Sequence, residues 1–118
     1  MPPAGSSAID KYFGRMNGPT ASSYVKGICG EEMEFYLIIE DGVITEVKYY
    51  TQGCEATRAC VEFVASLADK NTIKRALLIS AGQVIDRLAG TLPVEHLHCS
   101  ILAITALYKA VADYLLKV

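Results

Sequence analysis

The spacing of apolar residues changes at Gly53, and this change limits the fold more than any other feature of the sequence. Before Gly53, apolar and polar residues alternate, which is typical of half-buried β-strands. After Gly53, apolar residues recur about every 3.6 residues, which is typical of amphipathic helices. A chain of 118 residues can bury one core. We therefore predict an α+β fold in which helices pack on one face of a small antiparallel three-stranded sheet.

Three segments before Gly53 have the composition or the alternation of strands. They are Ser23–Cys29, Glu32–Glu40 and Val43–Tyr49. Alternation along a strand places every second side chain on the same face of the sheet. One face should therefore carry Met33, Phe35, Leu37 and Ile39 from the second strand and Val43, Thr45, Val47 and Tyr49 from the third.

The connection between the second and third strands is predicted to be a three-residue loop, Glu40–Gly42. A two-residue loop would place Leu37 on the same face as Glu46, whereas the longer loop brings Leu37 and Thr45 together. Such a loop is a type I turn followed by a bulge, with a left-handed residue at its end. We therefore expect Gly42 to adopt the left-handed conformation.

Four helices are predicted after Gly53, at about Cys54–Lys70, Thr72–Ile79, Ala81–Leu88 and Leu97–Leu116. In the first helix the apolar side should cover the sheet, and a separate polar stripe is formed by Glu55, Arg58, Glu62 and Asp69. The last is a long C-terminal helix that should bury Ile101, Ile104, Tyr108, Val111 and Leu115 along one side.

The first 22 residues are predicted to be a flexible lead before a folded domain of residues 23–118. The lead begins with small residues and prolines and contains a short amphipathic segment, about Ile9–Met16, that we expect to be helical. Asn17, Gly18 and Pro19 follow this segment and should terminate the helix.

Charge and composition exclude several classes of function. The net charge of −2 and the dispersed lysines and arginines do not favour nucleic acid as a partner. The N-terminus lacks the pattern of a signal peptide, and no segment reaches the roughly 20 apolar residues needed to cross a membrane, so we expect a cytoplasmic protein without a membrane partner. Its four cysteines should then be reduced, which favours metal binding, persulfide chemistry or catalysis over disulfides.

Three of the four cysteines lie at the ends of predicted elements. Cys29 lies in the turn between two strands, Cys54 at a strand-to-helix junction and Cys99 in the first turn of the last helix. Helix starts favour thiolates, and thiolates bind metals. His98 offers a nitrogen and Glu31 a carboxylate as a fourth ligand. These positions fit a metal or cluster site assembled from three distant segments, and the residues alone leave buried core thiols as an equal alternative.

Two further residues have more ordinary interpretations. Cys60 lies six residues after Cys54 and aligns with the apolar side of its helix, so a small buried residue is the favoured interpretation. A persulfide relay or alternative metal ligand is the other possibility for Cys60. His96 is interpreted as a solvated turn residue rather than a metal ligand.

Five motifs together resemble one known family. They are Cys29-Gly30-Glu31, Glu40-Asp41-Gly42, Thr51-Gln52-Gly53-Cys54, the run from Leu97 to Ala103 that contains His98-Cys99-Ser100, and Ala112-Asp113-Tyr114. In order and spacing they resemble the IscU family of iron-sulfur cluster assembly scaffolds, equivalent to the N-terminal domain of NifU. The resemblance covers about residue 23 to the C-terminus.

This resemblance implies a scaffold rather than an enzyme. A [2Fe-2S] cluster would be built on it from iron and persulfide sulfur, with a cysteine desulfurase and apo iron-sulfur proteins as partners. Cys29, Cys54 and Cys99 match the family's cysteine ligands, and His98 matches the histidine beside the third. Sulfur would arrive at Cys99 or Cys29.

The chain also departs from the family pattern. Glu31 stands where the family usually has aspartate, and Leu92–His96 differs from the segment that binds an Hsp70-type chaperone in bacterial members. We therefore do not carry chaperone handoff over to this chain. The interval from Cys54 to Cys99 lacks the insertion typical of zinc-binding SufU-like relatives, which favours a scaffold over a sulfur-relay protein.

Two alternatives to the scaffold use the same residues. The first is a zinc-binding sulfur-relay protein of the sulfurtransferase type, and zinc could also occupy the site of a scaffold in the isolated protein. The second is a thiol enzyme with Cys99 as nucleophile and His98 as its partner.

Overall fold

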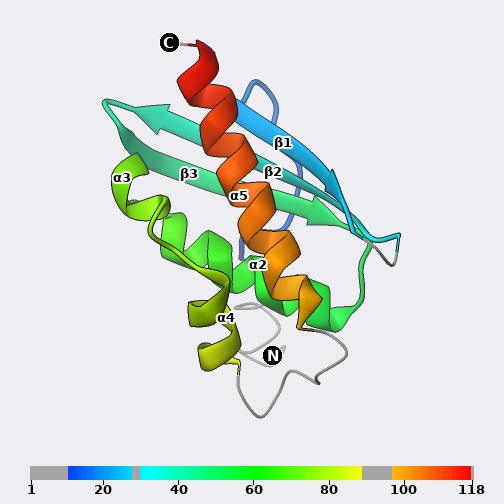
Figure 1. The fold of residues 1–118 in the computed structure, drawn as a ribbon. Coiled ribbons are helices and arrows are strands. Elements are labelled where there is room, and N and C mark those ends of the chain that lie inside the picture. Colours follow the sequence, from blue (N-terminus) through cyan, green and yellow to red (C-terminus); the bar gives the residue numbers. More distant parts are fainter. Residues whose placement is uncertain (1–10, 28–29, 89–96, 118) are drawn as a thin grey trace, which may run out of the picture.

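A three-stranded antiparallel sheet forms one layer of the fold, and helices form the other (Figure 1). The computed structural model describes residues 11–27, 30–88 and 97–117. The strands are β1 (Ala21–Lys26), β2 (Glu32–Glu40) and β3 (Val43–Thr51), in the order β1-β2-β3. The predicted sheet and its α+β class are confirmed.

One face of the sheet forms the floor of the hydrophobic core. The predicted face of β2 is confirmed, since Met33, Phe35, Leu37 and Ile39 are all buried. In β3 the prediction is partly wrong, because Val43 and Thr45 are only half-buried. The residues that β3 buries are Ile44, Val47, Tyr49 and Thr51.

The hairpin between β2 and β3 explains this difference. Its loop has two residues, Asp41 and Gly42, with φ of 53° and 75°, so the predicted three-residue loop is wrong while the left-handed Gly42 is confirmed. Positive φ at both loop residues is the geometry that suits a right-twisted hairpin. A β-bulge at Thr45 then shifts the register, so that Leu37 pairs with Val47. The bulge thus pairs Leu37 with an apolar residue, whereas the predicted longer loop would have placed it opposite Thr45.

Within the described residues, four helices follow the sheet, at positions close to the predicted ones. They are α2 (Glu55–Ala68), α3 (Ile73–Ala76), α4 (Ala81–Arg87) and α5 (His98–Lys117). The Thr72 side chain caps α3, and Ser80 and Gln83 form a capping box at α4. α5 lies across β1 and β2, and α2 packs against both β3 and α5 on the same face (Figure 1).

The buried face of α5 differs from the predicted one. Ile104 and Val111 are buried as expected, but Ile101, Tyr108 and Leu115 are at least one-third exposed. The core instead receives Leu102, Ala103, Ala106, Leu107 and Ala110. Three alanines in this set allow α5 to approach its neighbours closely, whereas the prediction had given priority to the larger side chains.

α5 is also long and apolar enough, by length and composition alone, to cross a membrane. The expectation that no segment approached this length is therefore wrong. Half of the helix is buried inside the protein against the sheet and α2, as in the core helix of a globular fold. Its apolar character is thus explained by packing.

Within the predicted lead, residues 11–20 form turns and an isolated β-bridge rather than a helix, and Ala21 and Ser22 already belong to β1. The backbone of Tyr12 and Gly14 makes two hydrogen bonds with Tyr49, of 2.9 and 2.7 Å, and so extends the edge of β3. Tyr12 is buried, and its hydroxyl donates to Asp69 at 3.1 Å. These residues are part of the packed fold.

This segment covers the polar stripe of α2. Glu62 is buried, and one of its carboxylate oxygens lies 3.4 Å from the backbone nitrogen of Tyr12. The guanidinium of Arg58 lies 4.3 Å from the centre of the Phe13 ring, within cation–π distance. The polar side of α2 therefore packs against the N-terminal segment. The sequence pattern had shown only that this side of the helix is polar.

Candidate metal and cluster site

The predicted ligands that the structure describes come from three segments that meet at one end of the sheet. Glu31 immediately precedes β2, Cys54 is the N-cap residue of α2, and His98 and Cys99 begin α5. Cys29 and His96 lie outside the described residues. The fold therefore gathers residues that are far apart in the sequence.

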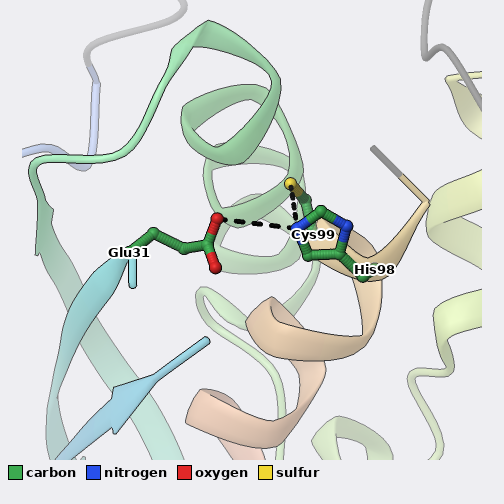
Figure 2. A group of neighbouring side chains, drawn as sticks. All are labelled: Glu31, His98 and Cys99. Atoms are coloured by element: carbon green, nitrogen blue, oxygen red, sulfur yellow. Dashed lines mark hydrogen bonds and ion pairs between the residues drawn. The ribbon is translucent and has the colours of Figure 1, made fainter. Parts of the chain in front are cut away.

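Glu31, His98 and Cys99 form the centre of the site (Figure 2). One potential ligand atom from each lies within 4.8 Å of the others. His98 Nε2 lies 3.5 Å from a Glu31 carboxylate oxygen and 3.9 Å from Cys99 Sγ. A thiolate, an imidazole and a carboxylate are ligands that zinc and iron accept. The side chains present can therefore hold a metal ion.

Backbone hydrogen bonds join Gly27, Gly30 and Glu31 just before β2, where the Glu31 side chain faces His98 (Figure 2). The Gly27 amide donates to the Glu31 carbonyl at 2.7 Å, and the Gly30 amide donates to the Gly27 carbonyl at 3.0 Å. Gly30 has φ of 88°, a conformation that other residues rarely adopt. The Glu31 side chain occupies the space that a Cβ on Gly27 would need. The local structure therefore explains both glycines: Gly27 leaves room for the Glu31 side chain, and Gly30 adopts a positive φ.

Cys54 is the exposed thiol of the site, at the start of α2. The backbone amide of Thr57 is the main cause that lowers the pKa of Cys54, with further help from the Thr57 hydroxyl and the Ala56 amide. Free amides at a helix N-terminus stabilise a thiolate. The thiol is thus accessible and prepared to ionise, as its predicted position at a helix start implied.

Cys99, in contrast, is fully buried. The hydroxyl oxygen of Thr57 lies 3.3 Å from Cys99 Sγ and 3.6 Å from Cys54 Sγ, so one buried side chain connects the two thiols. The sequence prediction missed Thr57, because a threonine in a helix is not a distinctive ligand. The available signal was its place three residues after an N-cap cysteine.

Cys60 lies three residues after Thr57 in α2 and is fully buried in the hydrophobic core. Burial, followed by the proximity of Cys99 and Cys54, raises the pKa of Cys60 to about 12. A thiol that stays protonated is a poor metal ligand and a poor nucleophile. These observations favour the interpretation of Cys60 as a packing residue.

Comparison with known proteins agrees with this arrangement. The family model of the NifU-like N terminal domain matches residues 8–118. The chain belongs to this family. The resemblance to IscU and the N-terminal domain of NifU, which rested on five short motifs, is therefore confirmed.

Similar proteins share both sequence and fold with this NifU-type chain. The iron-sulfur cluster assembly scaffold protein IscU 1 of Archaeoglobus fulgidus is 38% identical over 90 residues, which cover 76% of this chain and 58% of the relative. The scaffold protein IscU of Haemophilus influenzae is 32% identical over 90 residues, covering 75% and 70%. The chain thus spans less than two thirds of the length of the Archaeoglobus relative.

The fold is also found in a solved structure. The N-terminal part of a nitrogen-fixing NifU-like protein from Brucella abortus superposes with a TM-score of 0.68, covering 94% of each chain at 18% sequence identity. This similarity confirms the arrangement of a three-stranded sheet covered by helices with a long helix at the C-terminal end.

Proposed function

We propose that this NifU-type chain is a scaffold on which an iron-sulfur cluster is built and from which the cluster passes to other proteins. The observation that carries the proposal is the convergence of Glu31, His98 and Cys99 beside the exposed Cys54. The names of the IscU relatives support the same function. The cluster is the cargo of such a protein, and the chain itself is proposed to have no enzymatic turnover.

The proposed cargo is a [2Fe-2S] cluster held by a mixed set of ligands. Cys54 and Cys99 would supply thiolates together with Cys29, and His98 or Glu31 would supply the remaining ligand. Carboxylate and imidazole are harder ligands than thiolate, so this set should hold the cluster less firmly than four cysteines. Weaker binding suits a protein whose cargo must leave. The same ligands suit zinc, so zinc could also occupy the site in the isolated protein.

The sulfur is proposed to come from a cysteine desulfurase. A thiolate of the scaffold would attack the outer sulfur of the desulfurase persulfide, giving a scaffold persulfide and a free desulfurase thiolate. We had expected Cys99 or Cys29 to accept this sulfur. Because Cys99 is buried and Cys54 is exposed, Cys54 is the described thiol that we now propose as first acceptor.

The proposed partners are thus a cysteine desulfurase and apo iron-sulfur proteins in the cytoplasm. Neither nucleic acid nor membrane is included, in keeping with the small net charge and the packed α5. The names of the relatives do not favour the alternative of a zinc-binding sulfur-relay protein.

Anaerobic reconstitution with ferrous iron, cysteine, a cysteine desulfurase and dithiothreitol as the reductant that converts persulfide sulfur to sulfide tests this function. Absorption spectra and analysis of iron and labile sulfide should show equal amounts of the two and a visible chromophore. Cys54→Ser and Cys99→Ser should each abolish the stable chromophore while circular dichroism shows an unchanged fold. A normal cluster on Cys54→Ser would refute the ligand assignment, and bound zinc that iron and sulfide fail to displace would refute the scaffold.

A further inference from the structure

Thr57 is a buried polar residue placed between two of the proposed cysteine ligands. Its side chain has no exposed surface, and its hydroxyl lies within hydrogen-bonding distance of the sulfur atoms of both Cys54 and Cys99. Neither the predicted ligand set nor the sequence motifs include this residue. Its position suggests a role that depends on the hydroxyl.

A hydroxyl has one proton and can donate it to one sulfur at a time. The sulfur of Cys54 is exposed at the start of α2, where water can hydrogen-bond to it, whereas the sulfur of Cys99 is fully buried. The hydroxyl is 0.3 Å closer to Cys99 Sγ, at 3.3 Å compared with 3.6 Å for Cys54 Sγ. When both cysteines are ionised, we therefore expect the Thr57 hydroxyl to donate its hydrogen bond to Cys99 Sγ.

The Thr57 side chain is held in this orientation by packing. A Cβ built on Gly53 would lie 2.8 Å from Thr57 Cβ and Cγ2, so the threonine fills the space that the glycine leaves. A β-branched side chain in a helix also has few accessible rotamers. Thr57 thus presents its hydroxyl to the sulfur atoms before any metal arrives.

We propose that Thr57 is a positioning residue whose side-chain hydroxyl donates to the thiolate of the buried Cys99 rather than to that of the exposed Cys54. This inference rests on the proposed role of the two cysteines as ligands. The hydroxyl stabilises a thiolate at a buried position where little water is available, and so allows Cys99 to bind metal.

Cobalt(II) binding to the apo-protein tests the proposal, because thiolate-to-cobalt charge transfer reports ligation by sulfur. Thr57→Val removes the hydroxyl and keeps the branched shape, and should weaken cobalt binding roughly tenfold. Thr57→Ser keeps the hydroxyl and should bind within about threefold of the wild type. Thr57→Ala also removes the hydroxyl and adds no larger group, so it should bind cobalt as weakly as the valine variant. It provides the test if valine disturbs the packing.

The assignment of the hydroxyl to Cys99 is tested in two backgrounds, each of which lacks one of the two cysteines. Thr57→Val should still cause the roughly tenfold loss when combined with Cys54→Ala, since Cys99 remains. It should cause no further loss when combined with Cys99→Ala, because water can hydrogen-bond to the exposed Cys54 in place of the hydroxyl. Equal losses in both backgrounds, or wild-type affinity in both Thr57→Val and Thr57→Ala, would overturn the proposal.

This experiment separates the role of Thr57 from the function of the scaffold. Cobalt binding needs neither a desulfurase nor sulfide. If cobalt binding follows the expected pattern and no cluster forms on reconstitution, Thr57 keeps its role and the scaffold function fails. If a cluster forms on the wild type and Thr57→Val binds cobalt normally, the scaffold function stands and the role of Thr57 is refuted.

Discussion

The carboxylate of Glu31 lies in the space that a side chain on Gly27 would occupy. Replacing Gly27 with alanine should therefore displace the Glu31 side chain, because a side chain can move more easily than the backbone around it. Because Glu31 would then leave His98, we expect Gly27→Ala to weaken cobalt or ferrous iron binding by roughly tenfold with little change in the fold. Metal titration followed by absorption, with thermal unfolding for the fold, measures both effects.

Gly82 in α4 provides the matched control for this change. A Cβ on Gly82 would have Ser80 Oγ as its nearest neighbour, at an ordinary contact distance of 3.7 Å. Gly82→Ala should leave metal affinity unchanged and stabilise the helix by up to about 1 kcal/mol. Equal metal affinities in the two alanine variants would show that Glu31 does not contribute to the site.

Cys54 and Cys60 should react very differently with iodoacetamide. The pKa of Cys54 is lowered mainly by the backbone amide of Thr57, and its thiol is exposed. The pKa of Cys60 is raised to about 12 by burial. Because the thiolate is the reactive form, mass spectrometry of peptides after treatment at pH 8 should show modified Cys54 and unmodified Cys60. In urea both should react, and rapid modification of Cys60 in the folded protein would contradict its assignment to the core.

Cys60 should also make stability fall at alkaline pH. The thiol ionises near its ordinary pKa of 9.0 in the unfolded chain but only near 12 in the folded protein. Between these values the unfolded state binds fewer protons, so the free energy of unfolding decreases as pH rises. Urea unfolding at pH 8 and pH 10 should show this loss, and Cys60→Ala should show a smaller one. The same pH dependence in both proteins would contradict this explanation.

Sequence alone identified the fold class but not every face. The buried face of β2 was predictable because large apolar residues alternate strictly from Met33 to Ile39. The hairpin was not, because a bulge at Thr45 and a longer loop both bring apolar residues into register. On α5 the apolar residues surround much of the helix. Whether Ile101 or the alanines face the core therefore depends on how closely the helix packs against its neighbours, which the sequence does not show.

The candidate site shows a similar division. Glu31, His98 and Cys99 were predicted because they have ligand chemistry and lie in recognisable motifs, and the structure brings them together. Thr57 was missed because its importance comes from contacts with two sulfur atoms that no sequence period encodes. Likewise, the burial of Cys99 could not be predicted from its position at the start of a helix.

The contact between Tyr12 and Asp69 should make residues 11–20 contribute to the stability of the whole domain. Tyr12→Phe removes a hydroxyl that donates to the Asp69 carboxylate at 3.1 Å and should lower the free energy of unfolding by about 1 kcal/mol in urea denaturation. Tyr24→Phe, at a side chain that is 52% exposed on β1, is the control and should change it by less than about 0.5 kcal/mol. If both variants unfold like the wild type, the N-terminal segment is not held by this hydrogen bond. A loss confined to Tyr12→Phe would place the start of the folded domain well before residue 23.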